Sequence, residues 1–395
     1  MEGKRILLAS EFSRGDATLA RLLPLATALA ASGHHITLAA PPAHAAAVTA
    51  AGLTFADAPR WTVPPPPGYA AVSYADLLLH HGYAAPDSLR TLLAGWQSVL
   101  AQAEPDLLVA DFAPTAMLAA RIAGAPTAAI GDGFSLPPLT TPLPPMRPWA
   151  ALPQDAAASV EGRVLAVINA RLLAAQVPFL RHLRDLFHAV PSYLCTVPEL
   201  DHYPNRTGAD FYGEVFPATA TPTPSWPAAA GERIYLDLHA GHPALPALIA
   251  VLDRLRLPTL VQATGWPARQ ADALERATIQ VAPTADRPAL LAGCDIAIAQ
   301  GHEVAVPALL AGKPLLLLPV FVEQMMTLHR LATQGLGHGI AANADTATID
   351  AALRRLVDDR ACRLRAANFA RAYHGYRPAI AIEAIAEAIE DHLAP

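Results

Sequence analysis

The stretch CDIAIAQGHEVAVPALLAGKPLLLLPVFVEQMMTLHRLATQGLG, residues 294–337, carries the clearest folding signal in the chain. A short apolar run at 296–298 is followed by a polar loop at 300–303 and by a helical pattern that closes at Gly312, where a helix C-terminal glycine belongs. The continuous leucines at 315–318 predict a strand that is buried on both faces. Strand, loop, helix and strand in this order predict an open α/β fold, in which ligands bind at the carboxyl ends of the strands.

The first half of the chain shows the same alternation. KRILLAS at 4–10 and HITLAA at 35–40 predict two parallel strands joined by a helix that ends at Gly33. Pro24 lies inside this helical pattern, so the helix either kinks at the proline or begins there. Further strands and helices follow, and a long helix is predicted at 161–188.

A proline-rich segment, PATATPTPSWP at 217–227, separates the two halves and has no apolar period. Directly after it, ERIYLDL at 232–238 repeats the pattern of the first predicted strand, so two similar α/β domains are expected. The last helix has isoleucines along one face and is expected to pack back on the first domain. The predicted parts are a first domain at 1–216, a linker at 217–230, a second domain at 231–375 and the returning helix at 376–395.

Composition excludes several classes of partner and site. The formal charge of −6 comes without any basic block, so no nucleic-acid partner is expected. Apolar residues make up 53% of the chain, yet no run approaches the roughly 18 apolar residues of a membrane span. The first residues hold too few apolar side chains for a signal peptide, and the 3 cysteines lie far apart without CxxC pairing. We therefore expect a cytoplasmic protein with reduced thiols and no structural metal.

Two such halves joined by a proline-rich connector resemble the GT-B glycosyltransferases that use UDP or TDP sugars, a family that includes bacterial macrolide and glycopeptide glycosyltransferases. The resemblance covers nearly the whole chain. Its most specific segment is LLAGKPLLLLPVFVEQ at 309–324, because the family places an acid–amide pair, here Glu323 and Gln324, after a proline-ended strand to bind sugar hydroxyls. The other matching segments are 13–41, 105–126, YGEV at 212–215 and GLG at 335–337.

The resemblance implies two Rossmann-like domains that face a cleft, the first for an acceptor and the second for a nucleotide sugar. It also implies direct displacement with inversion at the anomeric carbon. Such a reaction needs a base near the acceptor and a diphosphate leaving group that is held by dipoles. No metal and no cofactor are expected, since the nucleotide-diphosphate sugar is a co-substrate.

Several residues of the first domain follow predicted strands and are candidates for the acceptor side. Asp16 stands where the family keeps its catalytic base, although it could instead cap the following helix. Asp111 and Asp132 could orient that base or bind the acceptor, or they could be solvated turn acids. Phe12 and Phe134 lie in nearby loops and could line an apolar acceptor pocket, or they could pack in the core.

The donor side departs from the family at its phosphate loop. The family's His-Gly-Gly-x-Gly-Thr corresponds here to Ala299–Val304, where only Gly301 survives. Glu303 places a negative charge where phosphates bind, and two charges ~4 Å apart at an effective dielectric of about 20 repel by roughly 4 kcal/mol. Either His302 or an arginine offsets this charge, or Glu303 points away, or the donor binds in another manner. The residues expected to contact the donor are His239, Gln300, Gly301, His302, Glu303, Glu323 and Gln324.

The resemblance implies a metal-independent, inverting glycosyltransferase of the hexosyltransferase type that acts on a small, apolar, natural-product-like acceptor. A second interpretation is a non-catalytic GT-B homologue that binds a ligand or a partner protein. The altered loop at 299–304 favours the homologue, whereas Asp16, Glu323 and Gln324 favour the enzyme. The nucleotide base, the sugar, the acceptor and a homodimer are left open.

Overall fold

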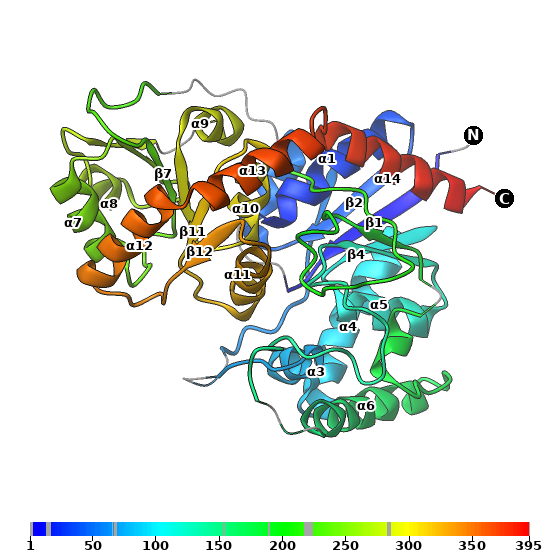
Figure 1. The fold of residues 1–395 in the computed structure, drawn as a ribbon. Helices are drawn as coiled ribbons and strands as arrows, with labels where there is room; N and C mark the ends of the chain where they lie inside the picture. Colours follow the sequence, from blue (N-terminus) through cyan, green and yellow to red (C-terminus); the bar gives the residue numbers. More distant parts are fainter. Residues whose placement is uncertain are drawn as a thin grey trace. The chain divides into compact units, whose positions relative to one another are not determined.

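A computed structural model of the chain describes residues 3–12, 17–64, 66, 69–151, 153, 155–188, 190–216, 224–282 and 286–394. Asp16 and residues 217–223 of the expected linker lie outside these ranges. The chain divides into two compact units, Met1–Pro217 with Arg377–Pro395 and Ala218–Tyr376 (Figure 1). Each unit holds one parallel six-stranded sheet with flanking helices, which confirms the predicted pair of Rossmann-like α/β units.

The first sheet has the strand order β3-β2-β1-β4-β5-β6. Its strands are β1 (Arg5–Ser10), β2 (His35–Ala40), β3 (Thr54–Asp57), β4 (Leu107–Asp111), β5 (Thr127–Gly131) and β6 (Ser192–Leu194). The chain runs outward from β1 to β3 and then returns to β4 on the other side of β1. We call the gap between β1 and β4 at their carboxyl ends the first switch point, where Ser10 is in register with Asp111.

The helices of the first unit include two short ones, α2 (Ala45–Ala50) and α3 (Tyr74–Leu78), that the sequence did not predict, and one that is shorter than predicted. Besides α2 and α3 they are α1 (Ala17–Ala31), α4 (Pro86–Ala103), α5 (Pro114–Ala123), α6 (Ala156–Ala174) and α14 (Pro378–Leu393). α1 runs through Pro24, so this helix does not begin at the proline. The long helix predicted at 161–188 is wrong, because α6 ends at Ala174 and Pro178 restricts the residue before it to extended backbone.

The core of the first unit includes the returning helix. Ile6 and Leu8 lie on the sheet face that packs against α1 and α14, while α4 and α5 lie on the opposite face (Figure 1). α14 contributes Ile385 and Ile389 to this core, as the isoleucine pattern predicts. Burial on both faces explains why the central strands are continuous apolar runs.

The second unit repeats this arrangement with the strand order β12-β11-β10-β7-β8-β9. Its strands are β7 (Ile234–Asp237), β8 (Thr259–Gln262), β9 (Ile279–Ala282), β10 (Ile296–Ala299), β11 (Leu315–Leu317) and β12 (Gly337–Gly339). Its helices are α7 (Leu245–Leu255), α8 (Ala268–Asp272), α9 (Arg287–Gly293), α10 (His302–Leu310), α11 (Val322–Gln334), α12 (Thr346–Asp358) and α13 (Arg360–Ala372). The second switch point lies between β7 and β10, where Asp237 is in register with Ala299.

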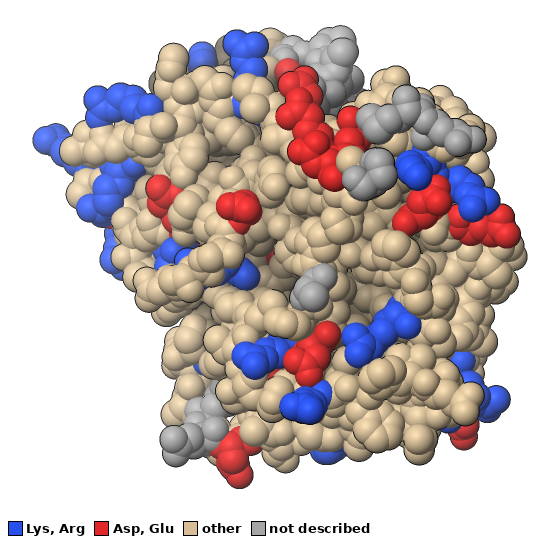
Figure 2. Space-filling view, turned by 90° about the vertical axis from the view of Figure 1, so that its right-hand side faces the viewer, with Lys and Arg blue, Asp and Glu red and all other residues tan. Residues whose placement is uncertain are grey.

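Charged side chains and helix hydropathy can be compared with the sequence expectations. On the face drawn in Figure 2, acidic and basic side chains are interspersed among uncharged ones. Among the helices that the structure describes, none combines the length and the apolar character needed to cross a membrane.

Truncation of Ile385 tests the packing of α14 in the first core. Ile385→Ala should lower the free energy of unfolding by about 2–4 kcal/mol, because the Ile385 side chain is only 1% exposed and its truncation leaves a cavity in the core. Ile380→Ala on the same helix is the matched control, since Ile380 is 56% exposed and should change stability by no more than ~0.5 kcal/mol. Guanidinium denaturation measures both, and equal effects would contradict the buried position of α14.

Candidate functional site

The first switch point is bridged by the backbone of two phenylalanines. Phe12 follows β1 and Phe112 follows β4, and the amide of Phe12 donates a hydrogen bond of 3.0 Å to the carbonyl oxygen of Phe112. Phe112 has a φ of +48°, in the left-handed region that a bulky side chain rarely adopts. Such conformations persist where the surroundings enforce them, and they cluster at functional sites.

A buried ion pair holds helix α1 to the end of β4. Both carboxylate oxygens of Asp111 accept hydrogen bonds from Arg21 Nη1, at 2.8 and 3.0 Å. Burial raises the pKa of Asp111 to about 6, although the nearby guanidinium of Arg21 lowers it. Arg21 Nη2 also lies 4.0 Å from the carboxylate of Asp132. Asp111 therefore fixes the helix that follows the β1 loop.

Asp132 organises the turn that follows β5. Its Oδ1 accepts hydrogen bonds from the amides of Phe134 and Ser135, both at 3.0 Å, and from the Ser135 hydroxyl at 3.1 Å. This carboxylate thus positions Phe134 through the backbone.

Glu11 is a buried acid that the sequence analysis did not single out. Its Oε2 accepts a hydrogen bond of 2.9 Å from the amide of Thr115 at the start of α5, and the Thr115 hydroxyl lies 2.8 Å from that of Tyr83. Burial raises the pKa of Glu11 to about 8, against the lowering effect of the Thr115 hydrogen bonds. At neutral pH the carboxyl group is therefore mostly protonated.

Aromatic rings gather around the first switch point. The rings of Phe12 and Phe112 are 5.2 Å apart between centroids, and those of Phe112 and Phe134 are 5.6 Å apart. The ring of His81 lies 4.2 Å from that of Phe12 between centroids, at a tilt of 32°, and the ring of His202 lies 5.9 Å from that of Phe134. Phe112, Phe134 and His81 are only partly buried, so part of this aromatic surface is open to an apolar ligand.

The second switch point is also bridged by a hydrogen bond. The amide of His239, which follows β7, donates to Gln300 Oε1 beyond the end of β10 at 3.2 Å. Gly301 then provides the N-cap of α10. A Cβ atom at Gly301 would lie only 2.7 Å from Gln324 Cγ, so glycine is required by the close approach of this side chain.

The acid–amide pair opens α11 with two different environments. Gln324 is buried, and its Oε1 accepts hydrogen bonds from the amides of Val320 at 2.8 Å and Phe321 at 3.2 Å. Glu323 is half-buried and its Oε1 accepts a 3.1 Å hydrogen bond from the Thr327 hydroxyl. Gln324 therefore shapes the turn before α11, while Glu323 lies closer to the surface.

Arg287 is placed at the second switch point by residues of β7. Its Nη2 donates to Asp237 Oδ2 at 3.0 Å, and its Nε donates to the Tyr235 hydroxyl at 3.3 Å. The Tyr235 hydroxyl in turn donates to Asp237 at 2.9 Å. Nothing in the sequence marked this arginine, because it follows a different strand from the one that supplies its partners.

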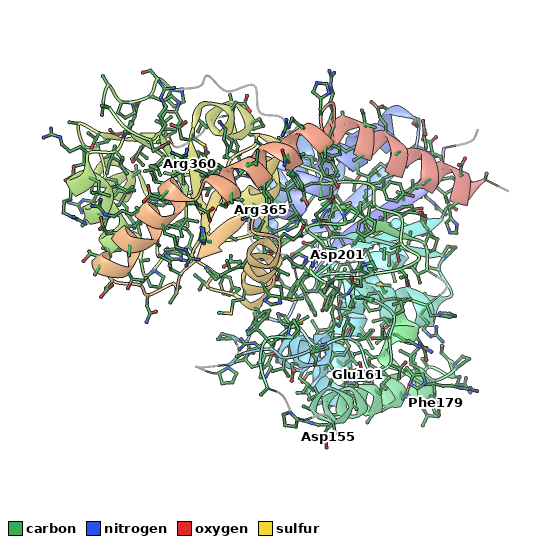
Figure 3. The ribbon with its side chains drawn as sticks, viewed as in Figure 1. Asp155, Glu161, Phe179, Asp201, Arg360 and Arg365 are labelled. Carbon is green, nitrogen blue, oxygen red and sulfur yellow. The ribbon has the colours of Figure 1, made fainter. Side chains whose placement is uncertain are left out.

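A group of possible metal ligands in the second unit is accounted for by hydrogen bonds. Ligand atoms of His338, Asp359 and Cys362 lie within 4.8 Å of one another. Asp359 accepts from the Cys362 amide and pairs with His338 Nε2, both at 2.9 Å, at the start of α13, the helix on which Figure 3 labels Arg360 and Arg365. Burial raises the pKa of the Cys362 thiol to about 11, which disfavours the thiolate that a metal would need.

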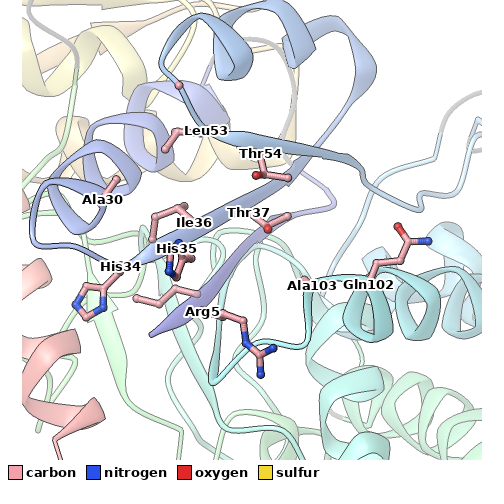
Figure 4. Close-up of a pocket in the computed structure, with 12 residues that line it drawn as sticks. Arg5, Ala30, His34, His35, Ile36, Thr37, Leu53, Thr54, Gln102 and Ala103 are labelled. Atoms are coloured by element: carbon pink, nitrogen blue, oxygen red, sulfur yellow. The ribbon is translucent and has the colours of Figure 1, made fainter. Parts of the chain in front are cut away.

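A cavity in the first unit lies at the end of the sheet opposite to the first switch point. It has a volume of about 280 Å³ and is lined by Arg5, His35, Thr54 and Gln102 among others (Figure 4). Arg5 begins β1 and His35 begins β2, so this cavity lies at the amino ends of the strands. Ligands of open α/β sheets bind at the carboxyl ends, so we do not assign the cavity to the site.

Comparison with known proteins identifies the architecture. No protein-family model and no curated protein matches the sequence. The calicheamicin glycosyltransferase CalG4 matches with a TM-score of 0.72 at 21% identity over 100% of both chains. The glycosyltransferase SnogD from Streptomyces nogalater matches with a TM-score of 0.68 at 19% identity, also over 100% of both chains.

A third match is the spinosyn rhamnosyltransferase SpnG complexed with thymidine diphosphate, with a TM-score of 0.69 at 18% identity over 98% of this chain and 100% of that chain. The chain has the GT-B fold. At these identities the likeness establishes the architecture, and the chemistry of this GT-B protein rests on its own site residues.

The GT-B architecture gathers the predicted residues at the two switch points. In the first unit it brings together the acceptor-side residues Phe12, Asp111, Asp132 and Phe134. In the second unit it brings together the donor-side residues His239, Gln300, Gly301 and Gln324. His302 is buried as the first residue of α10, and Glu303 follows it in the first turn. Asp16 lies outside the described residues.

The sequence analysis missed Glu11, Phe112 and Arg287. Glu11 and Phe112 directly follow strands, so the rule that selected Asp111 could also have selected them. No sequence signal pointed to Arg287.

The raised pKa of Glu11 predicts a pH-dependent stability that Glu11→Gln removes. Because the pKa is about 8 in the folded protein against 4.5 ordinarily, the stabilisation from the protonated form is full below about pH 4.5 and is lost as the pH rises to about 8. The unfolding free energy of Glu11→Gln should therefore rise relative to wild type between about pH 5 and pH 8, by about 1.4 kcal/mol per pH unit.

Urea denaturation at several pH values measures this difference. Glu104→Gln, at an exposed glutamate of the same unit, is the control for replacing any carboxylate by an amide. A difference between Glu11→Gln and wild type that stays constant with pH would show that Glu11 is ionised throughout this range.

Proposed function

We propose that this protein is a metal-independent, inverting glycosyltransferase that moves a sugar from a nucleotide-diphosphate sugar to a small, apolar, natural-product-like acceptor. The observation that carries the proposal is that the candidate acceptor residues and the candidate donor residues gather at the switch points of two different sheets. Switch points are the ligand sites of open α/β sheets. We assign the acceptor to the first unit and the nucleotide sugar to the second.

The aromatic surface of the first unit supports an apolar acceptor. Phe12, Phe112 and Phe134 form a connected set of rings, and two of the three are partly exposed. Rings in this arrangement offer a large apolar area with little conformational entropy to lose on binding. A solved neighbour, the spinosyn rhamnosyltransferase SpnG, is complexed with spinosyn aglycone, which supports the same class of acceptor.

The second unit supports a nucleotide-sugar donor. α10 begins directly after Gly301, so the positive end of its dipole and the backbone N–H groups of its first turn lie there, which favours phosphate oxygens. We assign the sugar hydroxyls to the Glu323 carboxylate and to the amide nitrogen of Gln324, whose oxygen bonds the backbone. Solved neighbours complexed with thymidine diphosphate support TDP as the nucleotide.

The chemical step then follows from these assignments. The base removes the proton of the acceptor hydroxyl as its oxygen attacks the anomeric carbon, and the bond from that carbon to the phosphate oxygen breaks. The nucleoside diphosphate leaves with the electron pair, and the configuration at the anomeric carbon inverts. We assign the base to Asp16, and we assign Asp111 the task of holding α1, which begins at Ala17, through Arg21.

Replacement of Asp16 tests the proposed base. Asp16→Asn should lower kcat at least about 100-fold and leave the dissociation constant of the nucleotide sugar nearly unchanged, because the amide cannot accept the proton. Release of UDP or TDP from a panel of nucleotide sugars, with a panel of hydroxylated polyketide acceptors, measures turnover. Binding of the donor is measured by calorimetry.

Asp57→Asn is the matched control, since Asp57 lies in the same unit with a side chain that is 64% exposed. Equal turnover of Asp16→Asn and wild type would remove Asp16 as the base. If the wild-type protein turns over no nucleotide sugar, and none raises its melting temperature, the proposed enzyme activity is wrong and the protein is the non-catalytic GT-B homologue.

A further inference from the structure

The start of α10 carries a charge that opposes the proposed donor. Glu303 lies in the first turn of this helix, directly after the N-cap Gly301 and His302. The helix dipole and the backbone N–H groups attract phosphate, but a carboxylate in the same turn repels it. Diphosphate binding at this helix therefore calls for a cation that comes from another element.

Arg287 supplies a permanent positive charge at this switch point. It begins α9, and its guanidinium bonds Asp237, the last residue of β7. Asp237 is in register with Ala299, the last residue of β10, and α10 begins three residues after Ala299. The guanidinium thus lies at the carboxyl end of β7, the strand that pairs with β10 at this switch point.

The charge of Glu303 acts on the same guanidinium. Burial lowers the pKa of Arg287, but the Asp237 carboxylate, the Tyr235 hydroxyl and, to a smaller extent, the Glu303 carboxylate outweigh this effect, so the pKa lies above its ordinary value. Arginine stays protonated at every pH of interest, so this cation is always present beside the start of α10.

The hydrogen bonds to Asp237 and Tyr235 use only some of the N–H groups of the Arg287 guanidinium. Nη2 and Nε bond Asp237 and the Tyr235 hydroxyl, and the side chain is still 29% exposed. A guanidinium has five N–H donors in a fixed plane, and it matches phosphate oxygens in geometry and charge. Because two residues of β7 already orient it, little further entropy is lost when a ligand binds.

We propose that Arg287 is the residue of this chain that binds the diphosphate of the nucleotide sugar, and that it offsets the charge of Glu303 at the start of α10. This inference rests on the proposed function and adds to it a specific donor contact. Arg287 takes over the charge compensation that the altered loop at 299–304 does not provide. Asp237 and Tyr235 act as positioning residues for the guanidinium.

A charge-balanced double variant tests this role. Arg287→Gln alone would leave Asp237 without its cation, so Asp237→Asn/Arg287→Gln is the main probe because it removes one positive and one negative charge together. Its affinity for TDP should fall by about 10- to 100-fold, the loss expected for hydrogen bonds to a charged group. Its affinity for thymidine, which has no phosphate, should stay within about twofold of wild type.

Glu303→Gln tests the repulsion between the Glu303 carboxylate and the diphosphate. It should change the TDP affinity in the opposite direction from the loss of Arg287. Removal of the carboxylate should tighten TDP binding by at least about threefold and leave thymidine binding unchanged. Both constants are measured by calorimetry, with circular dichroism and the melting temperature recorded for each variant.

The matched control is Glu232→Gln/Arg363→Gln. This pair also lies in the second unit and has a similar exposure, 31% for Arg363 against 29% for Arg287, but Glu232 lies before the amino end of β7. Its TDP affinity should equal that of wild type. An equal loss in both double variants would mean that any broken ion pair weakens the unit, and it would overturn the assignment.

The outcomes separate this inference from the proposed function. If wild type binds TDP and Asp237→Asn/Arg287→Gln binds it equally well, Arg287 is not the diphosphate ligand and the proposed function stands. If the double variant does not fold, Arg287→Lys keeps the charge without the planar fork, and unchanged TDP affinity in that variant overturns the proposed contact by the fork. If wild type binds neither TDP nor UDP, both the inference and the proposed function fail.

Discussion

Burial of both faces of two parallel sheets is the constraint on which the rest of this structure depends. Helices cover each face, so the central strands consist almost wholly of apolar residues and cannot carry polar side chains along their length. Polar chemistry is therefore confined to the residues at and just beyond the strand ends. At each switch point the neighbouring strands lead to connections on opposite sides of the sheet, and the space between them is where a ligand fits.

The same electrostatic solution occurs at both switch points. Asp111 ends β4 and pairs with Arg21, and Asp237 ends β7 and pairs with Arg287. An acid at the buried end of a strand loses most of its hydration, and a hydrogen-bonded arginine from a helix compensates for that loss. Removal of one partner from a buried pair of this kind costs about 3–5 kcal/mol, so Arg21, whose side chain is only 11% exposed, is expected to contribute strongly to the stability of the first unit.

The acid–arginine pair has different surroundings in the two units. In the first unit the arginine is buried between two acids and fixes α1 in place, and the surface beyond it is aromatic. In the second unit the arginine is partly exposed, and its electrostatic neighbours include Glu303 in the first turn of α10. Apolar rings suit an acceptor, while an exposed cation next to a helix start suits a diphosphate.

Local patterns in the sequence determined most of the strands and helices and the return of α14, because apolar runs and period-3.6 stripes depend only on neighbouring residues. They did not indicate the short strands β3 and β12 or the end of α6 at Ala174. The sequence also determined which acids stand at strand ends, since Asp111 and Asp132 directly follow their apolar runs. Only the tertiary structure decided which partners these acids have. Arg21 and Asp111 are 90 residues apart in the sequence, and Arg287 and Asp237 are 50 apart. Each contact exists because the strand order brings a helix and a distant strand end together at the carboxyl end of one sheet.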